Sequence, residues 1–234
     1  MQARKDKFKT YKDVFDRFTI EKLFHLTSQG HFEGLESPIS MGKEASVFSA
    51  KTKEGKSIAV KIYRLQNCNF NRMLDYLRLD FRYMHIKKGK RNIVFSWCQR
   101  EFRNLLKARE ANVRAPLPIA FSNNILVMEY IGNGEAAPKL KDTVPKNPEQ
   151  FFEKIIVSIK RFYQHGMVHG DLSPFNILNH HEEPVFIDFS QAVPRESSAA
   201  EELLERDVEN VLTFFAKHGV SASKETILSN IRKK

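Results

Sequence analysis

The chain has 234 residues, of which 41% are hydrophobic and 28% are charged, so a globular fold is expected and wholesale disorder is excluded. Its two cysteines support no disulfide framework and suit a reducing compartment. The N-terminal stretch lacks the apolar core of a signal peptide, and no apolar run is long enough for a membrane span. We therefore expect a cytoplasmic protein.

The net charge of +10 is concentrated in one part of the sequence. Twelve lysines and arginines but only three acidic residues lie between Arg64 and Arg109. This charge favours phosphate-rich partners through a sequence-independent attraction, but a solvated basic surface explains it equally well. Phe81 and Tyr83 lie among these arginines, where they could stack on nucleic-acid bases or anchor the surrounding segment.

The first part of the sequence predicts helices followed by a small sheet. Residues 11–29 have apolar side chains at roughly helical spacing, and Thr19 is a candidate N-cap for a second helix there. Short β-rich runs follow in residues 36–65, separated by the turns "MGKE" and "KEGK". Residues 66–92 are polar, basic and weakly patterned, which indicates a flexible insertion.

The rest of the sequence alternates between helical and β-rich patterns. Residues 95–110 have helical spacing, and two strands are expected around an Asn-Asn turn in residues 115–132. A linker rich in Gly, Pro and Asn follows, then a helix near residues 149–165, a hairpin closing at "HHEEP", and further helices. Together these elements predict a two-lobed α+β fold. The predicted parts are an N-terminal helical extension (1–37), an N-lobe (38–131) and a C-lobe (132–234).

Three polar side chains of the predicted C-lobe suggest a metal and phosphate site. The stretch "HGDLSPFNIL" contains Asp171 and Asn176, and Asp188 stands at the end of the β-rich run "PVFIDFS". Mg²⁺ prefers oxygen donors of this kind and usually takes one or two carboxylates together with substrate phosphates.

The predicted N-lobe contains further candidates for binding an anion. Lys61 lies in an apolar strand, which is costly unless the lysine meets an anion, and Glu101 in the next helix could orient it. The turn in "SPISMGKEASVFSA" could cradle phosphates with its backbone N–H groups. Alone, each signal has an ordinary explanation, such as an edge-strand lysine, an exposed glutamate or a hairpin glycine. The order of these candidate residues and motifs along the chain, however, is the order found in protein kinases.

Several motifs resemble the RIO family of atypical protein kinases, and its first subfamily in particular. They are "SPISMGKEASVF", "AVKIY", "WCQREFRNL", "MEYIG", "HGDLSPFNIL" and "IDFSQAV", and the resemblance covers roughly residues 19–220. It implies a two-lobed protein-kinase-like fold. The N-lobe would have a small antiparallel sheet and one long helix, the C-lobe would be mainly helical, and helices would precede the N-lobe.

The resemblance also implies roles for individual residues. Asp171 would be the catalytic aspartate, while Asn176 and Asp188 would hold Mg²⁺, or Mn²⁺ in its place. Asp188 could also accept the phosphate transiently in an ATPase cycle. The residues implied in ATP binding are Ser40, Gly42 and Lys43 over the phosphates, Lys61 with Glu101, and the adenine-contacting hinge of Met128, Glu129, Tyr130 and Ile131.

The implied function is transfer of the ATP γ-phosphate to a protein hydroxyl or to water, in the maturation of the small ribosomal subunit. The expected partners are the subunit precursor with its rRNA and a protein substrate, with no DNA or membrane partner, and the expected source is archaeal. Two positions depart from the family pattern: Met41 replaces a threonine in S-T-G-K-E-A, and Pro174 replaces a glutamate in D-L-S-E-[FY]-N.

Other functions fit parts of the same pattern. Small-molecule phosphotransferases of the aminoglycoside type have a nearly identical H-G-D-x-x-x-x-N loop, although they usually have a larger helical lobe. A small atypical kinase that works with tRNA-modification complexes is also near this size. A non-catalytic scaffold that binds nucleotide and RNA remains a further alternative.

Overall fold

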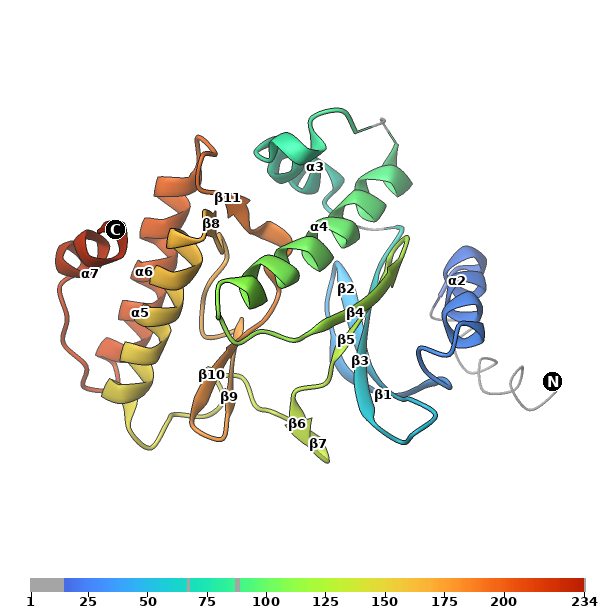
Figure 1. Cartoon of the computed structure of the whole chain (residues 1–234), viewed down its shortest axis with the longest axis horizontal. Helices are drawn as coiled ribbons and strands as arrows, with labels where there is room; N and C mark the ends of the chain where they lie inside the picture. Colours follow the sequence, from blue (N-terminus) through green and yellow to red (C-terminus); the bar gives the residue numbers. More distant parts are fainter. Residues whose placement is uncertain (1–14, 67, 87–88, 234) are drawn as a thin grey trace. The chain divides into compact units, whose positions relative to one another are not determined.

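The computed structural model describes residues 15–66, 68–86 and 89–233, and these form two compact units. The first unit contains the described residues up to 77, together with residues 85–102 and 117–130. The second unit contains residues 78–84, 103–116 and 131–233. The elements of both units are labelled in Figure 1.

The first unit is built on a five-stranded antiparallel sheet with the strand order β1-β2-β3-β5-β4. The strands are β1 (Leu35–Met41), β2 (Ala45–Lys51), β3 (Ser57–Tyr63), β4 (Pro118–Ser122) and β5 (Ile125–Glu129). Buried and partly buried residues alternate along β2, as expected for a strand with one face toward the core. By contrast, all but the first residue of β3, the central strand of the five, are buried.

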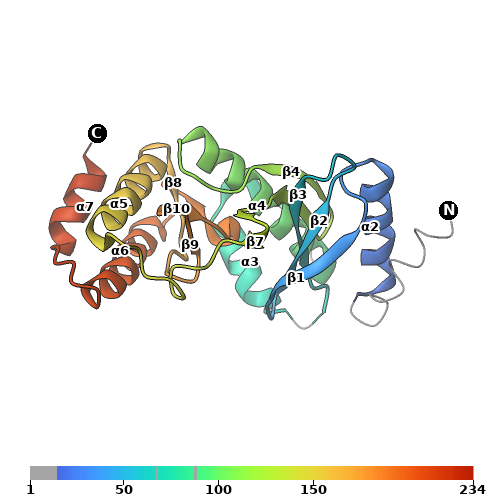
Figure 2. The same ribbon diagram turned by 90° about the horizontal axis from the view of Figure 1, so that it is seen from below.

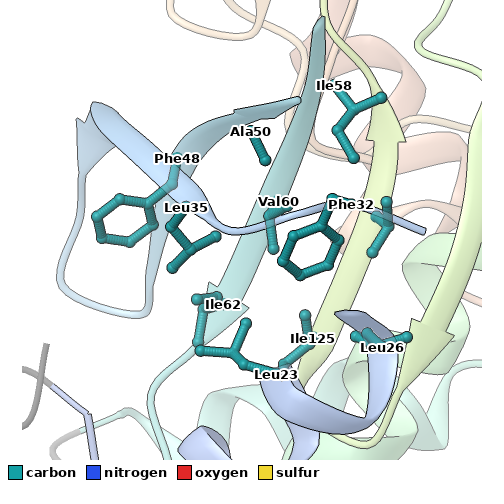
Figure 3. Packing of buried hydrophobic residues seen from close by; sticks show 11 residues of the cluster. Leu23, Leu26, Phe32, Leu35, Phe48, Ala50, Ile58, Val60, Ile62 and Ile125 are labelled. Atoms are coloured by element: carbon teal, nitrogen blue, oxygen red, sulfur yellow. The ribbon is translucent and has the colours of Figure 1, made fainter. Parts of the chain in front are cut away.

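Helix α2 (Arg17–Ser28) covers one face of this sheet. Its residues Leu23 and Leu26 meet Phe32, Val60 and Ile125 in a continuous apolar cluster, which Figure 3 shows from close by. Leu23, Val60 and Ile125 are completely buried. Because one apolar cluster joins α2 to the sheet, β3, the strand that carries Lys61, is held in place by packing.

The second unit is mainly helical. Its helices are α5 (Pro148–Gln164), α6 (Ala200–Ala216) and α7 (Lys224–Arg232), which lie side by side in Figures 1 and 2. Its short strands are β6 (Gly132–Asn133), β7 (Glu135–Ala136), β8 (Met167–Val168), β9 (Ile177–His180), β10 (Glu183–Phe186) and β11 (Val193–Pro194). Two 3₁₀ turns, η2 (Phe81–Tyr83) and η3 (Phe189–Gln191), complete the unit. The predicted helix near 149–165 and the hairpin at "HHEEP" are both present.

Two further helices belong mainly to the first unit. They are α3 (Phe70–Arg78) and α4 (Lys90–Glu110). Among the described residues, no helix combines the length and the apolar composition needed to cross a membrane.

The start of α2 differs from the sequence prediction. Asp16 is the N-cap, and its carboxylate accepts hydrogen bonds from both the backbone N–H and the hydroxyl of Thr19. Thr19 was the predicted cap, but it lies inside the helix, and its hydroxyl also accepts a hydrogen bond from the Asn124 amide. A carboxylate one turn earlier satisfies the free N–H groups at least as well as a hydroxyl does. Residues 11–14 of the predicted helix lie outside the described residues.

The segment expected to be a flexible insertion also contains regular structure. Met73 and Leu77 of α3 are buried at a spacing of four residues, which places them on one face of the helix. Two buried positions among many basic residues were too weak a signal to reveal this helix in the sequence. The predicted linker is likewise more ordered than expected, because residues 138–140 pair with β9.

The N-cap of α2 gives a first prediction. Replacing Asp16 with alanine leaves N–H groups at the helix start without an acceptor, so we expect the free energy of unfolding to fall by about 1 kcal/mol. The variant Asp16→Asn should retain most of this stability. Urea unfolding followed by circular dichroism measures both changes. An unchanged midpoint in Asp16→Ala would show that Asp16 is not the cap.

Candidate active site

Lys61 is a buried cation of the first unit. It lies in the middle of β3, and its ammonium group contacts the Glu101 carboxylate of α4, with Nζ and Oε1 2.7 Å apart. The Tyr63 hydroxyl donates a hydrogen bond to the other oxygen of the same carboxylate. Both Lys61 and Glu101 are almost fully buried, at 6% and 1% exposure. A buried pair of this kind holds its charges in place because removing either partner would leave the other unpaired in an apolar environment.

The turn between β1 and β2 is tight at Gly42. The Gly42 N–H donates a hydrogen bond to the Ala45 carbonyl, and a Cβ atom at residue 42 would lie 2.9 Å from that same oxygen. A larger residue would therefore force the turn to move. Ser40 is partly exposed at the end of β1, while Lys43 and Met41 are exposed. The turn thus presents the predicted phosphate-contacting residues at the surface of the first unit, and the side chain of Met41 points away from the core.

The predicted hinge begins at the C-terminal end of β5. Met128 and Glu129 end β5, and Glu129 is fixed by two hydrogen bonds with the backbone of Leu117. Tyr130 is partly exposed and is the last hinge residue in the first unit. Ile131 belongs to the second unit, where it is buried, and its carbonyl accepts a hydrogen bond from the Ala137 N–H.

Asp171 and Asn176 converge in the second unit. The Asn176 side-chain amide donates to the Asp171 carboxylate over 3.1 Å and to the Asp171 carbonyl over 2.8 Å. The loop between them is closed by a hydrogen bond from the Asn176 N–H to the Ser173 carbonyl. Both side chains remain partly exposed, so they are accessible to a ligand. Pro174 does not disturb this geometry, and its carbonyl accepts a hydrogen bond from the backbone of Lys141.

Asp188 lies at the same end of the β9–β10 hairpin as Asn176. The Ile187 N–H donates to the Asn176 carbonyl, so Asp188 follows directly after a residue paired with Asn176. Its backbone has φ 60° and ψ 68°, in the left-handed region that residues other than glycine rarely adopt. The Ser190 hydroxyl donates a hydrogen bond to the Asp188 carboxylate. Strained backbone of this kind is concentrated at functional sites.

These side chains suit a hard divalent cation. The amide nitrogen of Asn176 is used by Asp171, which leaves the Asn176 oxygen as the atom to face a cation. With the two carboxylates this gives an oxygen-only donor set, as Mg²⁺ prefers. Within the described residues, no group of three or more His, Cys, Asp or Glu side chains could hold a metal ion.

The sequence analysis missed the residues of α6 that hold the Asp171 loop. The carboxylate of Asp207 accepts hydrogen bonds from the N–H groups of Gly170 and Leu172, at 2.7 and 2.8 Å. Asn210 donates to the Leu172 carbonyl from one turn further along the helix. Asp207 is 1% exposed. These contacts fix the backbone on both sides of Asp171. In the sequence, an Asp on the otherwise apolar face of this helix was the available signal for such a role.

The loop also needs glycine at position 170 and a histidine before it. Gly170 has a φ of +75°, and a Cβ atom there would lie 3.0 Å from the Gln191 carbonyl. The imidazole Nε2 of His169 lies 3.1 Å from the Ile187 carbonyl, and the ring packs on Phe189. His169 therefore braces the loop.

Asn104 links two further segments of the second unit. Its amide nitrogen donates to the carbonyls of Phe189 and Ala192, each over 3.0 Å, which secures the η3 turn after Asp188. Its oxygen accepts a hydrogen bond from the Arg82 guanidinium. Asn104 is completely buried. Its position three residues after Glu101 gave no indication of this role in the sequence.

Comparison with known proteins assigns the chain to a family. A model described as the RIO domain matches residues 46–227, which is well over half of the chain. The chain belongs to the RIO family. This confirms the resemblance seen in the sequence, and the chain is a RIO-type protein kinase with the kinase-like fold expected for that family. The alternatives of a small-molecule phosphotransferase or a tRNA-modification kinase do not agree with this match.

Individual RIO proteins are similar over most of the chain. The RIO-type serine/threonine-protein kinase Rio1 of Haloferax volcanii is 40% identical over 95% of this chain and 77% of its own length. The human serine/threonine-protein kinase RIO1 is 35% identical over 90% of this chain, which spans only 40% of the human protein. These names confirm the assignment to the first subfamily.

A solved RIO structure supports the fold. It is the Rio2 kinase of Chaetomium thermophilum in an ADP/Mg²⁺-phosphoaspartate complex, with a TM-score of 0.70 and 25% identity. The alignment covers 91% of this chain and 66% of the Rio2 chain.

The buried carboxyl of this RIO chain gives a second prediction. Burial raises the pKa of Asp207 from 3.8 to about 7, against the opposing effect of the two N–H donors and Arg206. Between these pH values the folded state binds a proton that the unfolded state has released. The contribution of Asp207 to the free energy of unfolding is therefore complete below about pH 4 and is lost as the pH rises through about 7.

The variant Asp207→Asn lacks this titration. We expect it to be less stable than the parent chain, because an amide cannot accept both N–H donors, and we expect the difference to narrow as the pH rises. Urea unfolding of both proteins at pH values on either side of this range measures the difference. If the difference in free energy of unfolding between the two proteins stays constant, or widens as the pH rises, the raised pKa of Asp207 is contradicted.

Proposed function

We propose that this chain is an ATP-dependent serine/threonine kinase and ATPase that acts in maturation of the small ribosomal subunit. The main support is the arrangement of the second unit, where Asn176 contacts Asp171 and the hairpin brings Asp188 beside Asn176. Its relatives are named serine/threonine-protein kinases, and the Rio2 complex contains ADP and Mg²⁺. ATP and Mg²⁺ are accordingly the proposed substrate and cofactor.

The residues of the first unit bind the nucleotide in this proposal. Lys61 neutralises charge on the ATP phosphates, and Glu101 and Tyr63 keep its ammonium group in position. Ser40, Gly42 and Lys43 cover the phosphates from the β1–β2 turn. The adenine contacts the hinge of residues 128–131. Ordering these groups before ATP arrives reduces the entropy cost of binding.

The residues of the second unit perform the transfer. Asp171 accepts the proton of the attacking hydroxyl or water, and its carboxylate is oriented for this by the Asn176 amide. Asn176 and Asp188 would hold Mg²⁺, and the bound ion would supply positive charge against the charge that develops on the phosphate oxygens. The Asp207 carboxylate contributes by fixing the backbone around Asp171.

Two acceptors are compatible with this arrangement. In the kinase reaction a serine or threonine hydroxyl attacks the γ-phosphorus, its proton passes to Asp171, and ADP leaves. In the ATPase reaction the Asp188 carboxylate attacks the γ-phosphorus with loss of ADP, and water then hydrolyses the aspartyl phosphate. The phosphoaspartate in the Rio2 complex supports the second route for a protein of the same fold.

The biological setting is inferred from charge as well as from the family. The basic stretch between Arg64 and Arg109 favours a phosphate-rich partner such as rRNA, in the cytoplasm. Among the described residues of this stretch, Arg100 is completely buried beside Trp97 and adds nothing to the surface charge. The remaining exposed cations support contact with the subunit precursor.

Asp171→Asn separates catalysis from binding. The amide cannot accept the proton of the attacking group, so we expect phosphate release from ATP to fall by about 10²- to 10⁴-fold while ATP still binds. The assay measures Mg²⁺-dependent phosphate release by the purified chain, with and without precursor small subunits. Asp142→Asn, at an exposed carboxylate outside the site, is the matched control and should keep full activity.

The outcomes of this experiment separate the alternatives. Release that is stimulated by the precursor subunits and lost in Asp171→Asn supports the proposed enzyme. ATP binding without release in either condition would favour the non-catalytic scaffold. Loss of ATP binding in a folded Asp171→Asn chain would contradict the role given to Asp171.

Asp188→Asn tests the metal site. Asparagine tolerates the left-handed backbone that Asp188 adopts, whereas alanine would add a backbone penalty of about 1–2 kcal/mol. We expect Asp188→Asn to keep the fold and to lose most of the Mg²⁺ dependence of nucleotide binding. Titration of Mg²⁺ against a fluorescent ADP analogue measures this dependence. An unchanged titration would remove Asp188 from the metal site.

A further inference from the structure

The segment from Arg78 to Met84 presents two large apolar side chains to solvent. Phe81 is 68% exposed and Met84 is 65% exposed, the two highest values among the large hydrophobic residues that the structure describes as exposed. Both belong to the second unit, in and next to the η2 turn. Exposed aromatic side chains of this size often mark an interaction surface.

The turn that carries Phe81 is rigidly anchored. Asp80 is completely buried, and its carboxylate accepts hydrogen bonds from the backbone N–H and the guanidinium of Arg82. The same guanidinium donates to Asn104 over 2.8 Å. The exposed side chains are therefore held on an ordered turn, which lowers the entropy cost of binding a partner.

Phe81 and Tyr83 have opposite environments. Tyr83 is 5% exposed, and the guanidinium groups of Arg82 and Arg103 lie 5.7 and 5.8 Å from its ring. From the sequence, both Phe81 and Tyr83 could either stack on a base or anchor the surrounding segment. In the structure Tyr83 is the anchor, and the Phe81 ring is available to a partner.

The charge around Phe81 indicates the class of partner. Arg78 and Arg103 are exposed in the same unit, and Asp80, the one acidic residue between positions 78 and 84, is buried and paired with Arg82. The segment is thus cationic with an exposed aromatic ring. Single-stranded nucleic acids are bound in this way, with bases stacked on aromatic rings and phosphates near basic side chains.

We propose that residues 78–84, with Arg103, form a binding surface for single-stranded nucleic acid, in which Phe81 stacks on a base. Arg78 and Arg103 attract the flanking phosphates, and Met84 covers the edge of the base. The choice of RNA as the physiological ligand rests on the proposed ribosomal function. The stacking surface itself rests on the exposure, anchoring and charge of these residues.

The test measures fluorescence anisotropy of a short labelled oligouridine with the full chain. Phe81→Ala and Phe81→Leu should weaken binding by about 5- to 150-fold, the range equivalent to one stacked base, because neither side chain offers a ring. Phe81→Trp should bind at least as tightly as the parent chain. Arg78→Gln should reduce the dependence of affinity on salt, by about one in the log–log slope.

Controls distinguish a specific surface from a general loss of apolar area. Val157→Ala removes an exposed apolar side chain from α5 and should leave the affinity unchanged. The Phe81 variants should unfold at the same urea concentration as the parent chain, since this side chain is mostly exposed. A deoxyribose oligonucleotide of the same length tests the source of the ligand, and tighter binding of DNA than of RNA would overturn the choice of RNA.

Three results would overturn the surface itself. They are an oligouridine that does not bind, an unchanged affinity in Phe81→Ala, and full affinity in Phe81→Leu, which would show that no aromatic ring stacks on a base. The assay requires no turnover, so it is independent of the proposed enzyme activity. A chain that hydrolyses ATP but does not bind RNA would contradict this inference alone, and a chain that binds RNA through Phe81 without hydrolysis would contradict only the enzymatic proposal.

Discussion

The geometry of the candidate catalytic loop depends on one buried carboxylate. Asp207 accepts hydrogen bonds from the N–H groups on either side of Asp171, one on each carboxylate oxygen, and buried N–H groups need such partners. Burial makes the ionised form costly, and the hydrogen bonds from the backbone offset part of that cost. The backbone on both sides of Asp171 is therefore held from α6, in addition to the contacts that Asn176 and His169 make.

Buried carboxylates held by several donors also occur in the first unit and in the η2 turn. Glu101 is buried with Lys61 on one oxygen and Tyr63 on the other, and Asp80 is buried with Arg82. Each carboxylate is fully engaged by donors from its own unit, so its direction is determined by several bonds at once. Buried charge pairs add little to net stability compared with apolar packing, but they define one geometry. Here that geometry positions groups with a chemical role.

Much of this could be predicted from the sequence, for reasons that differ between elements. Asp171 and Asn176 are five residues apart in one loop, so their meeting follows from local chain geometry. The strands were recognisable as β-rich runs separated by turns, and Lys61 was conspicuous as a charge in an apolar run. Asn104 was missed because Phe189 and Ala192 lie 85 and 88 residues away along the chain, where neither periodicity nor spacing gives a signal. Asp207 stands among apolar positions of α6, but its partners lie 37 and 35 residues away, so its position alone did not identify them. The start of α2 was misplaced because Asp16 and Thr19 are both good caps, and only the structure shows which one faces the free N–H groups.

The left-handed backbone at Asp188 also limits how this position can change during evolution. Among the common residues, only glycine, asparagine and aspartate adopt that conformation at low cost. A lineage that no longer needed the carboxylate would therefore be expected to drift to asparagine or glycine before any other residue. Within the family, the residue at this one position would then distinguish working enzymes from descendants that have kept the fold and lost the chemistry.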